Sequence, residues 1–245
     1  MLGLTSTSRR AIQEEAEKPF WISFSDLMTA LMVLFLVVMA AALLSVTQGI
    51  RDIQAQETYR AVTIGSCMEQ VKVYTDTIPG VKVREHSVDF GTRAKFQNNS
   101  SDLSQAQQEF LRRFVPQVLD IARKPVCQEW LKQIVVEGFA SRSGTYLHNL
   151  NLSTQRSERV LCALLEPTAV PRLAATDREL IQNLFFAGGY SFNSTKKNDD
   201  ESRRIELKLE FYALREKQEA SPQTRKIPPP PMALDNDTSC PIDAR

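Results

Sequence analysis

An excess of charge of either sign is missing from this chain: 30 Lys and Arg balance 29 Asp and Glu, leaving a formal net charge of +1. A near-neutral chain has no electrostatic attraction for nucleic acid, so we expect no nucleic-acid partner. Histidine is scarce, with only His86 and His148. No G-x-S-x-G nucleophile motif accompanies them and no cysteine spacing resembles a metal site, so we expect no enzyme activity, no metal and no cofactor.

Cysteine is absent from the first 66 residues, and all four cysteines follow that point: Cys67, Cys127, Cys162 and Cys240. An even number of cysteines in one part of a chain is typical of disulfides in an oxidising compartment. Four unpaired cysteines in the cytosol are the alternative. Three disulfide pairings are possible, and the sequence does not choose among them.

One apolar run of membrane length is present, from residue 20 to 47, reading FWISFSDLMTALMVLFLVVMAAALLSVT. A bilayer is crossed by about 20 apolar residues in a helix, so we predict a single transmembrane helix here. The apolar core is too long for a cleaved signal peptide, which favours an uncleaved anchor.

Asp26 is the ionisable side chain inside that run. It lies roughly 8 Å along the helix axis from Trp21, whose ring prefers the membrane interface. Asp26 is therefore past the interface but short of the midplane. Carboxylates in membrane helices usually mark ion or proton pathways, so Asp26 is predicted to carry an ion. The alternative is a helix cap near the water, with Ser23 and Ser25 as competing caps.

Small and polar side chains accompany Asp26 along one side of the predicted helix. Ser23, Thr29 and Ala30 are spaced from it by three or four residues, and valines continue the stripe. A stripe of this kind suits a helix packed against protein rather than lipid. Because one helix cannot form a pore, we predict that Ser23, Thr29 and Ala30 line an ion path completed by partner helices.

The rest of the chain is predicted to contain a helical linker at 48–79, a domain at 80–212 and a Pro-rich extended tail at 213–245. Within the domain, strands are expected at 81–90, 131–139, 184–190 and 204–211, and helices at 102–124 and 152–166. Ser104 is the expected N-cap of the first helix, and Pro125 lies beyond its end. Strands mixed with helices predict an α+β fold, an α/β sandwich.

The segment PFWISFSDLMTALMVLFLVVM resembles the transmembrane segment of MotB-type stator subunits. The resemblance implies that Asp26 takes up and releases H+ or Na+. It also implies a dimer of this chain inside a ring of MotA-like subunits. The location implied is the bacterial inner membrane, with a cytoplasmic N-tail at 1–19 and, in agreement with the cysteines, a periplasmic domain. Residues 49–60 occupy the place of the stator plug, but no residue motif supports a plug there, so we expect this segment to be a spacer.

VVEGFASRSGTYLHNLNLSTQRSERV and SRRIELKLEF resemble the OmpA-like peptidoglycan-binding domain. The resemblance implies peptidoglycan as ligand, and the wall contacts carried over are Ser141, His148, Asn149, Leu152, Arg156 and Arg204. Arg156 would pair with a carboxylate of diaminopimelate. Ser141 replaces the family's Asp, so the ammonium group of diaminopimelate would lack its countercharge, and His148 replaces a Tyr. A surface ion pair of Arg156 with Glu158 or Glu137 is the alternative.

The SFSDLMTALM segment, the short N-tail and the cysteines most resemble those of the ZorB-type subunits of Zorya anti-phage systems. The ring partner of such subunits is ZorA-like. A flagellar MotB-type subunit and a passive membrane-to-wall anchor are the alternatives.

Overall fold

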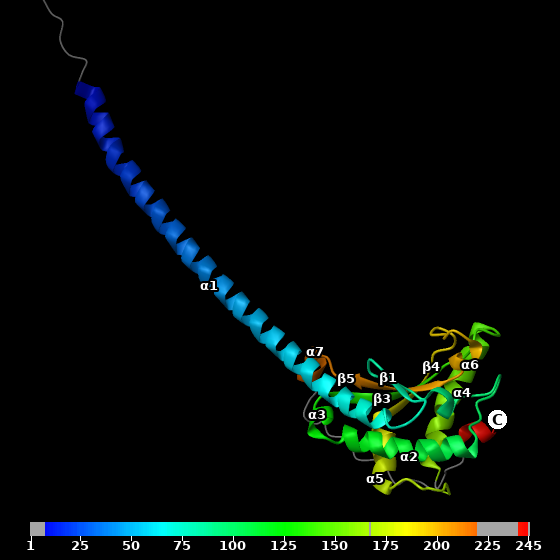
Figure 1. Cartoon of the computed structure of the whole chain (residues 1–245). Coiled ribbons are helices and arrows are strands. Elements are labelled where there is room, and N and C mark those ends of the chain that lie inside the picture. The colour runs from blue at the N-terminus through cyan, green and yellow to red at the C-terminus, as the bar shows by residue number, and fades with distance from the viewer. Residues whose placement is uncertain (1–7, 167, 220–239, 245) are drawn as a thin grey trace, which may run out of the picture. The chain divides into compact units, whose positions relative to one another are not determined.

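The computed structural model describes residues 8–166, 168–219 and 240–244, with side chains in the first helix from Phe24 onward (Figure 1). The chain divides into two compact units, 1–57 and 58–245, each considered by itself.

The first unit is formed by α1 (Ser8–Thr75), which also supplies the first residues of the second unit. Every side chain from residue 24 to 57 is exposed. Among the described residues, α1 is the one helix long and apolar enough to cross a membrane. Since α1 begins at Ser8, Asp26 lies well inside it, and the alternative that Asp26 caps a helix is wrong.

The second unit is built on a five-stranded mixed sheet in the order β1-β2-β5-β3-β4. The strands are β1 (Lys82–Arg84), β2 (Ser87–Asp89), β3 (Leu131–Gly138), β4 (Phe185–Gly189) and β5 (Ile205–Phe211). β3 and β4 are parallel, and the other neighbours are antiparallel. The predicted α+β class is confirmed.

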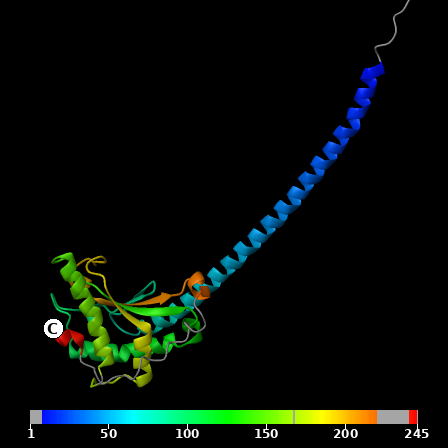
Figure 2. The same cartoon turned by 180° about the vertical axis from the view of Figure 1, so that it is seen from behind.

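Helices α2, α4 and α5 cover one face of this sheet, as Figures 1 and 2 show. The helical elements are η1 (Gly91–Ala94), α2 (Gln105–Ala122), α3 (Pro125–Gln128), α4 (Tyr146–Leu165), α5 (Ala175–Leu184), α6 (Asp199–Ser202), α7 (Leu214–Glu219) and η2 (Pro241–Ala244). The apolar core lies between the sheet and these helices, where Ile205, Leu207 and Leu209 of β5 are fully buried or nearly so.

The start of α2 is the one predicted from the sequence. Ser104 is its N-cap: the Gln107 main-chain N–H donates to the Ser104 hydroxyl, and the Ser104 N–H donates to the Gln107 side chain at 2.9 Å. This reciprocal arrangement satisfies two N–H groups that the first helical turn leaves without partners.

Two expectations about the second unit were wrong. Residues 81–90 form a hairpin of β1 and β2 rather than one strand, because Glu85 adopts a left-handed conformation (φ 49°) that reverses the chain. The predicted boundary between linker and domain at residue 80 is also wrong, because the second unit begins at residue 58. The linker at 48–79 is helical as expected, but Ile64, Cys67 and Val71 within it are buried in the core of the second unit.

The predicted tail at 213–245 also holds structure, since α7 and η2 lie within it. The proline run at 228–231 lies outside the described residues.

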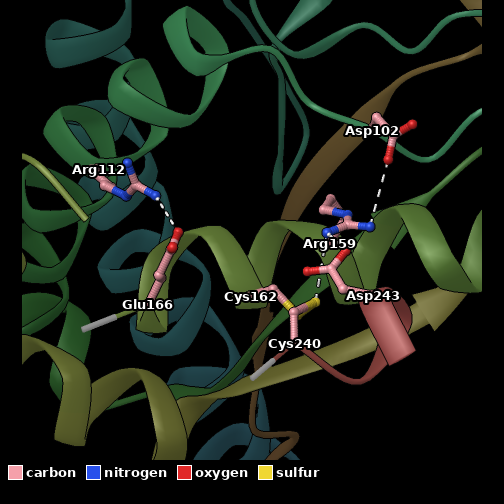
Figure 3. The surroundings of a disulfide bond; sticks show 7 residues. All are labelled: Asp102, Arg112, Arg159, Cys162, Glu166, Cys240 and Asp243. Atoms are coloured by element: carbon pink, nitrogen blue, oxygen red, sulfur yellow. Dashed lines mark hydrogen bonds and ion pairs between the residues drawn. A yellow bond between two sulfur atoms is a disulfide. The ribbon is translucent and has the colours of Figure 1, made fainter. Parts of the chain in front are cut away.

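The four cysteines form two disulfides, Cys67–Cys127 and Cys162–Cys240, with S–S distances of 2.05 and 2.13 Å. Disulfide formation is thus confirmed, and one of the three possible pairings is selected. Figure 3 shows the second bond: Cys240 precedes η2 and joins it to α4, beside an ion pair between Arg159 and Asp243 at 2.6 Å.

Candidate functional site

Asp26 and its predicted neighbours lie along one side of α1. Asp26, Thr29 and Ala30 line a shallow groove that continues past Val33 and Val37. The Thr29 hydroxyl donates to the Asp26 main-chain carbonyl at 2.9 Å. The side chain of Ser23 lies outside the described residues.

The carboxylate of Asp26 makes no hydrogen bond or ion pair with any residue that the structure describes. Its side chain is exposed, as are the apolar side chains around it. An exposed apolar helix surface that carries one unpaired carboxylate requires a covering partner if it lies in a membrane.

The second candidate site lies where β3 leads into α4, within the predicted wall-binding motif. Gly138 ends β3, and a Cβ atom there would lie 1.9 Å from the Ser153 carbonyl oxygen, so only glycine allows α4 to approach this closely. The Thr145 hydroxyl caps α4 by accepting from the His148 N–H at 3.4 Å. These local features start α4 at Tyr146, ahead of the predicted residue 152.

Arg156 lies at the centre of this site and is fully buried. Its guanidinium donates to three main-chain carbonyls, those of Phe139 at 2.8 Å, Ser100 at 3.0 Å and Gln97 at 3.1 Å. It also lies 5.0 Å from the Phe96 ring centroid. The alternative of a surface ion pair is therefore wrong.

No carboxylate among the described residues pairs with Arg156. Burial, and secondarily the positive charge of Arg203, lowers the pKa of Arg156 to about 10. The positive charge is stabilised by three peptide carbonyls and the face of the Phe96 ring, which offset part of the cost of burying a cation without a counterion.

Two loops meet in front of Arg156, at residues 97–101 and 139–145. His148 Nε2 contacts Asn99 Oδ1 at 2.7 Å, which joins the first loop to α4. The Asn149 amide donates to the Ser143 carbonyl at 2.8 Å, and the hydroxyls of Ser141 and Ser143 are 2.9 Å apart. These contacts close the second loop.

Of the six predicted wall contacts, His148 alone is exposed. Ser141, Asn149, Leu152, Arg156 and Arg204 are all less than a tenth exposed. The expectation that their side chains are open to a ligand is wrong for this conformation, because the polar groups of Asn149 and Arg156 are bonded to the two loops.

Arg204 has a different environment from the other five residues. Its guanidinium donates to Glu206 at 2.6 Å and to the Ser194 carbonyl, and it lies 4.0 Å from the Phe139 ring centroid. Its charge is thus neutralised within the protein. The sequence prediction missed Asn99 and the carbonyls of Gln97 and Ser100; the polar cluster QNNSS was the signal that a turn lies there.

The two histidines lie on separate elements. His86 is at the β1–β2 turn and packs edge-on against Phe211, with ring centroids 5.2 Å apart, whereas His148 is on α4.

Comparison with known proteins gives matches for both parts of the chain. Residues 7–49 match the family described as the membrane protein MotB of the proton-channel complex MotA/MotB. The Zorya protein ZorB of Escherichia coli O139:H28 is 40% identical over 224 residues, which cover 89% of this chain and 91% of that protein.

Solved structures show weaker similarity. The periplasmic domain of Helicobacter pylori MotB is 15% identical, with a TM-score of 0.37, over 54% of this chain and 82% of that one. The cell wall anchor of the Pseudomonas aeruginosa type VI secretion system is 19% identical, with a TM-score of 0.36, over 57% of this chain and 94% of that one.

One helix whose apolar run at 20–47 holds a single carboxylate, followed by a disulfide-bonded α+β domain, defines a membrane-anchored protein of the MotB-like class. Within that class, the identity over nearly the whole length shows that this chain belongs to the ZorB family.

Proposed function

We propose that this chain is the wall-anchored stator subunit of an ion-driven membrane motor that acts in Zorya anti-phage defence. Asp26 takes up and releases H+ or Na+, and a domain on the periplasmic side holds the subunit to peptidoglycan. The N-terminus is cytoplasmic, and α1 crosses the inner membrane once.

The observation that carries the ion role is the Asp26 carboxylate, which has no partner among the described residues and lies in the otherwise apolar, exposed run of α1. A charge moved across the membrane releases about 2.3 kcal/mol per 100 mV, which is available as work only if a titrating group couples the ion to a moving partner. We propose that this partner is a ring of MotA-like or ZorA-like subunits around two copies of this chain, with Thr29 and Ala30 facing the path.

Peptidoglycan binding is proposed at the two loops and the start of α4. Asn99, Arg142 and His148 are exposed there and offer hydrogen-bond donors. The buried guanidinium of Arg156 pairs with no carboxylate in the part of the chain that the structure describes, and a stem-peptide carboxylate would supply one if the loop at 97–101 moved away. Membership of the ZorB family and the resemblance of the Gly138-to-Arg156 segment to the OmpA-like wall motif support this role.

The ion role is tested by Asp26→Asn, with Asp52→Asn as the matched control. Asp52 is also exposed on α1 but follows the apolar run, so its loss removes the same charge outside the proposed path. With the partner subunit co-expressed, we expect Asp26→Asn to abolish ion conductance and phage protection while leaving the complex assembled. Asp52→Asn should retain both.

A passive membrane-to-wall anchor is the competing function. Full phage protection by Asp26→Asn would support the passive anchor. If Asp26→Asn loses protection but keeps its ion conductance, a transport role for Asp26 is contradicted. Motility complementation of a strain lacking a flagellar stator, without phage protection, would favour a flagellar MotB-type role instead.

A further inference from the structure

The start of α4 carries an exposed aromatic side chain that none of the wall-binding expectations used. Tyr146 is the first residue of α4 and is 45% exposed. Its hydroxyl makes no hydrogen bond with any residue that the structure describes. The ring is therefore held by packing, and its polar end is free to bind another molecule.

The position of the Tyr146 ring is set by the loop after β4. Phe192 meets it edge to face, with ring centroids 5.6 Å apart and an interplanar angle of 84°. Edge-to-face contact is one of the arrangements that aromatic pairs prefer, so Phe192 favours this orientation of the Tyr146 ring. The ring remains 45% exposed, which leaves part of it open to another molecule.

The loop that carries Phe192 is itself held at several points. The Ser191 hydroxyl donates to the Tyr146 carbonyl at 3.2 Å, and the Ser191 N–H donates to the Ser153 hydroxyl at 3.0 Å. The Ala140 N–H donates to the Ser191 carbonyl at 2.8 Å. Ser191 needs a left-handed conformation (φ 51°) to make these contacts. A ring fixed in this way loses little entropy when it binds a ligand.

Tyr146 is also close in sequence to the proposed stem-peptide site. Thr145 caps the same helix turn, and His148 contacts Asn99 two residues later. In peptidoglycan the stem peptide is attached to a sugar ring, so a protein that holds the stem near its attachment point brings that ring within reach of neighbouring side chains.

We propose that Tyr146, oriented by Phe192, is a saccharide subsite that stacks on a pyranose ring of the glycan strand. The C–H bonds on one side of such a ring pack against the electron-rich face of an aromatic side chain. The free Tyr146 hydroxyl is available to the sugar hydroxyl groups. This inference rests on the wall binding proposed above and adds the glycan as a second ligand class.

The test compares two soluble probes against the full chain in detergent by titration calorimetry. One probe is a stem tetrapeptide, and the other is the same peptide linked to its disaccharide. We expect wild type to bind the disaccharide-peptide about fivefold to tenfold more tightly, the gain of one good aromatic contact. Tyr146→Ala should remove that difference and leave the affinity for the free peptide unchanged.

Three further variants test the mechanism of the stacking. Tyr146→Phe should keep most of the difference in affinity between the two probes, because the ring remains. Phe192→Ala should reduce it, because the ring is no longer oriented. Leu147→Ala is the matched control: Leu147 is 73% exposed beside Tyr146, and its loss should change neither affinity. Equal melting temperatures would show that the variants are folded.

Several results would overturn the proposal. Tyr146→Ala could lower the affinity for both probes equally, which would assign the ring to the peptide site. It could also leave both affinities unchanged, which would show that the ring contacts neither ligand. It could instead change the mass of the assembly, which would make the ring a protein contact. If wild type binds neither probe, wall binding itself fails, whereas tight binding of both probes with no sugar preference refutes the saccharide subsite alone.

Discussion

Cys67 in α1 and Cys127 in α3 are joined by a disulfide, and both residues are fully buried. Within the second unit, the Tyr59 hydroxyl also donates to Glu129 at 3.0 Å, and the Arg60 guanidinium donates to the Tyr212 carbonyl at 2.7 Å. The last turns of α1 are thus covalently and non-covalently part of the second unit.

The two disulfides should differ in their response to reductant. Cys162 and Cys240 are half-buried, whereas Cys67 and Cys127 have no exposed surface. Because thiol exchange requires access of the attacking thiolate, we expect Cys162–Cys240 to be reduced first under native conditions. Stepwise reduction, alkylation and mass mapping would measure the order, and early labelling of Cys67 would contradict it.

Opening Cys162–Cys240 should also lower stability. The bond closes a loop with a sequence separation of 78 residues, for which the chain-entropy relation gives about 4.5 kcal/mol. The double variant Cys162→Ser/Cys240→Ser should show this loss in chemical denaturation and should lack the fast phase of reduction.

Arg156→Ala should destabilise the second unit rather than remove only a ligand contact. Three main-chain carbonyls would lose their donor, and unsatisfied buried acceptors cost about 1–3 kcal/mol each. We therefore expect a loss of at least ~3 kcal/mol in the free energy of unfolding, measured by chemical denaturation. The free energy of unfolding of Arg156→Lys should lie between those of wild type and Arg156→Ala, because an ammonium group cannot reach all three carbonyls. An unchanged unfolding midpoint for Arg156→Ala would contradict a structural role.

Gly138→Ala should disrupt the contact between β3 and α4. The new methyl group would lie 1.9 Å from the Ser153 carbonyl oxygen, so the backbone of α4 must move away. Overpacking of this kind costs roughly 1–3 kcal/mol or more. Gly65→Ala is the control: nothing lies within 4 Å of its Cβ, and alanine should stabilise α1 there by about 1 kcal/mol. Thermal unfolding of both variants would compare the two effects.

Glu129 should contribute to stability at neutral pH but not in acid. The hydrogen bond from Lys217, and that from Tyr59, lower the pKa of this carboxyl below its usual 4.5. A carboxylate with a lowered pKa stabilises the folded state above its unfolded-state pKa, and the contribution is lost as the pH falls through the folded-state value. Glu129→Gln should cost less than about 1 kcal/mol at pH 7, since the pair is partly exposed. The difference from wild type should shrink towards pH 3; a constant difference would point to packing rather than charge.

Local patterns predicted much of the chain before any contact was known. The apolar run around Asp26, the N-cap at Ser104 and the alternation of Ile205, Leu207 and Leu209 each depend on neighbouring residues along one element. The spacing of Asp26, Thr29 and Ala30 along one helix side follows from the helical period alone. Features of this kind are readable because propensity and periodicity act over a few residues.

The wall motif shows which features could not be predicted from local sequence patterns. Ser141, Asn149 and Arg156 could be located by their spacing in the sequence. Their exposure, however, depends on the distant loop at 97–101. Arg156 bonds to Gln97, 59 residues away, and Cys67 to Cys127, 60 residues away. By itself, the sequence determined the helical anchor, its single carboxylate and the α+β class, because these follow from local composition and period. Only the tertiary structure decided the disulfide pairing, the burial of Arg156 and the exposure of Tyr146, because each depends on which distant segments pack together.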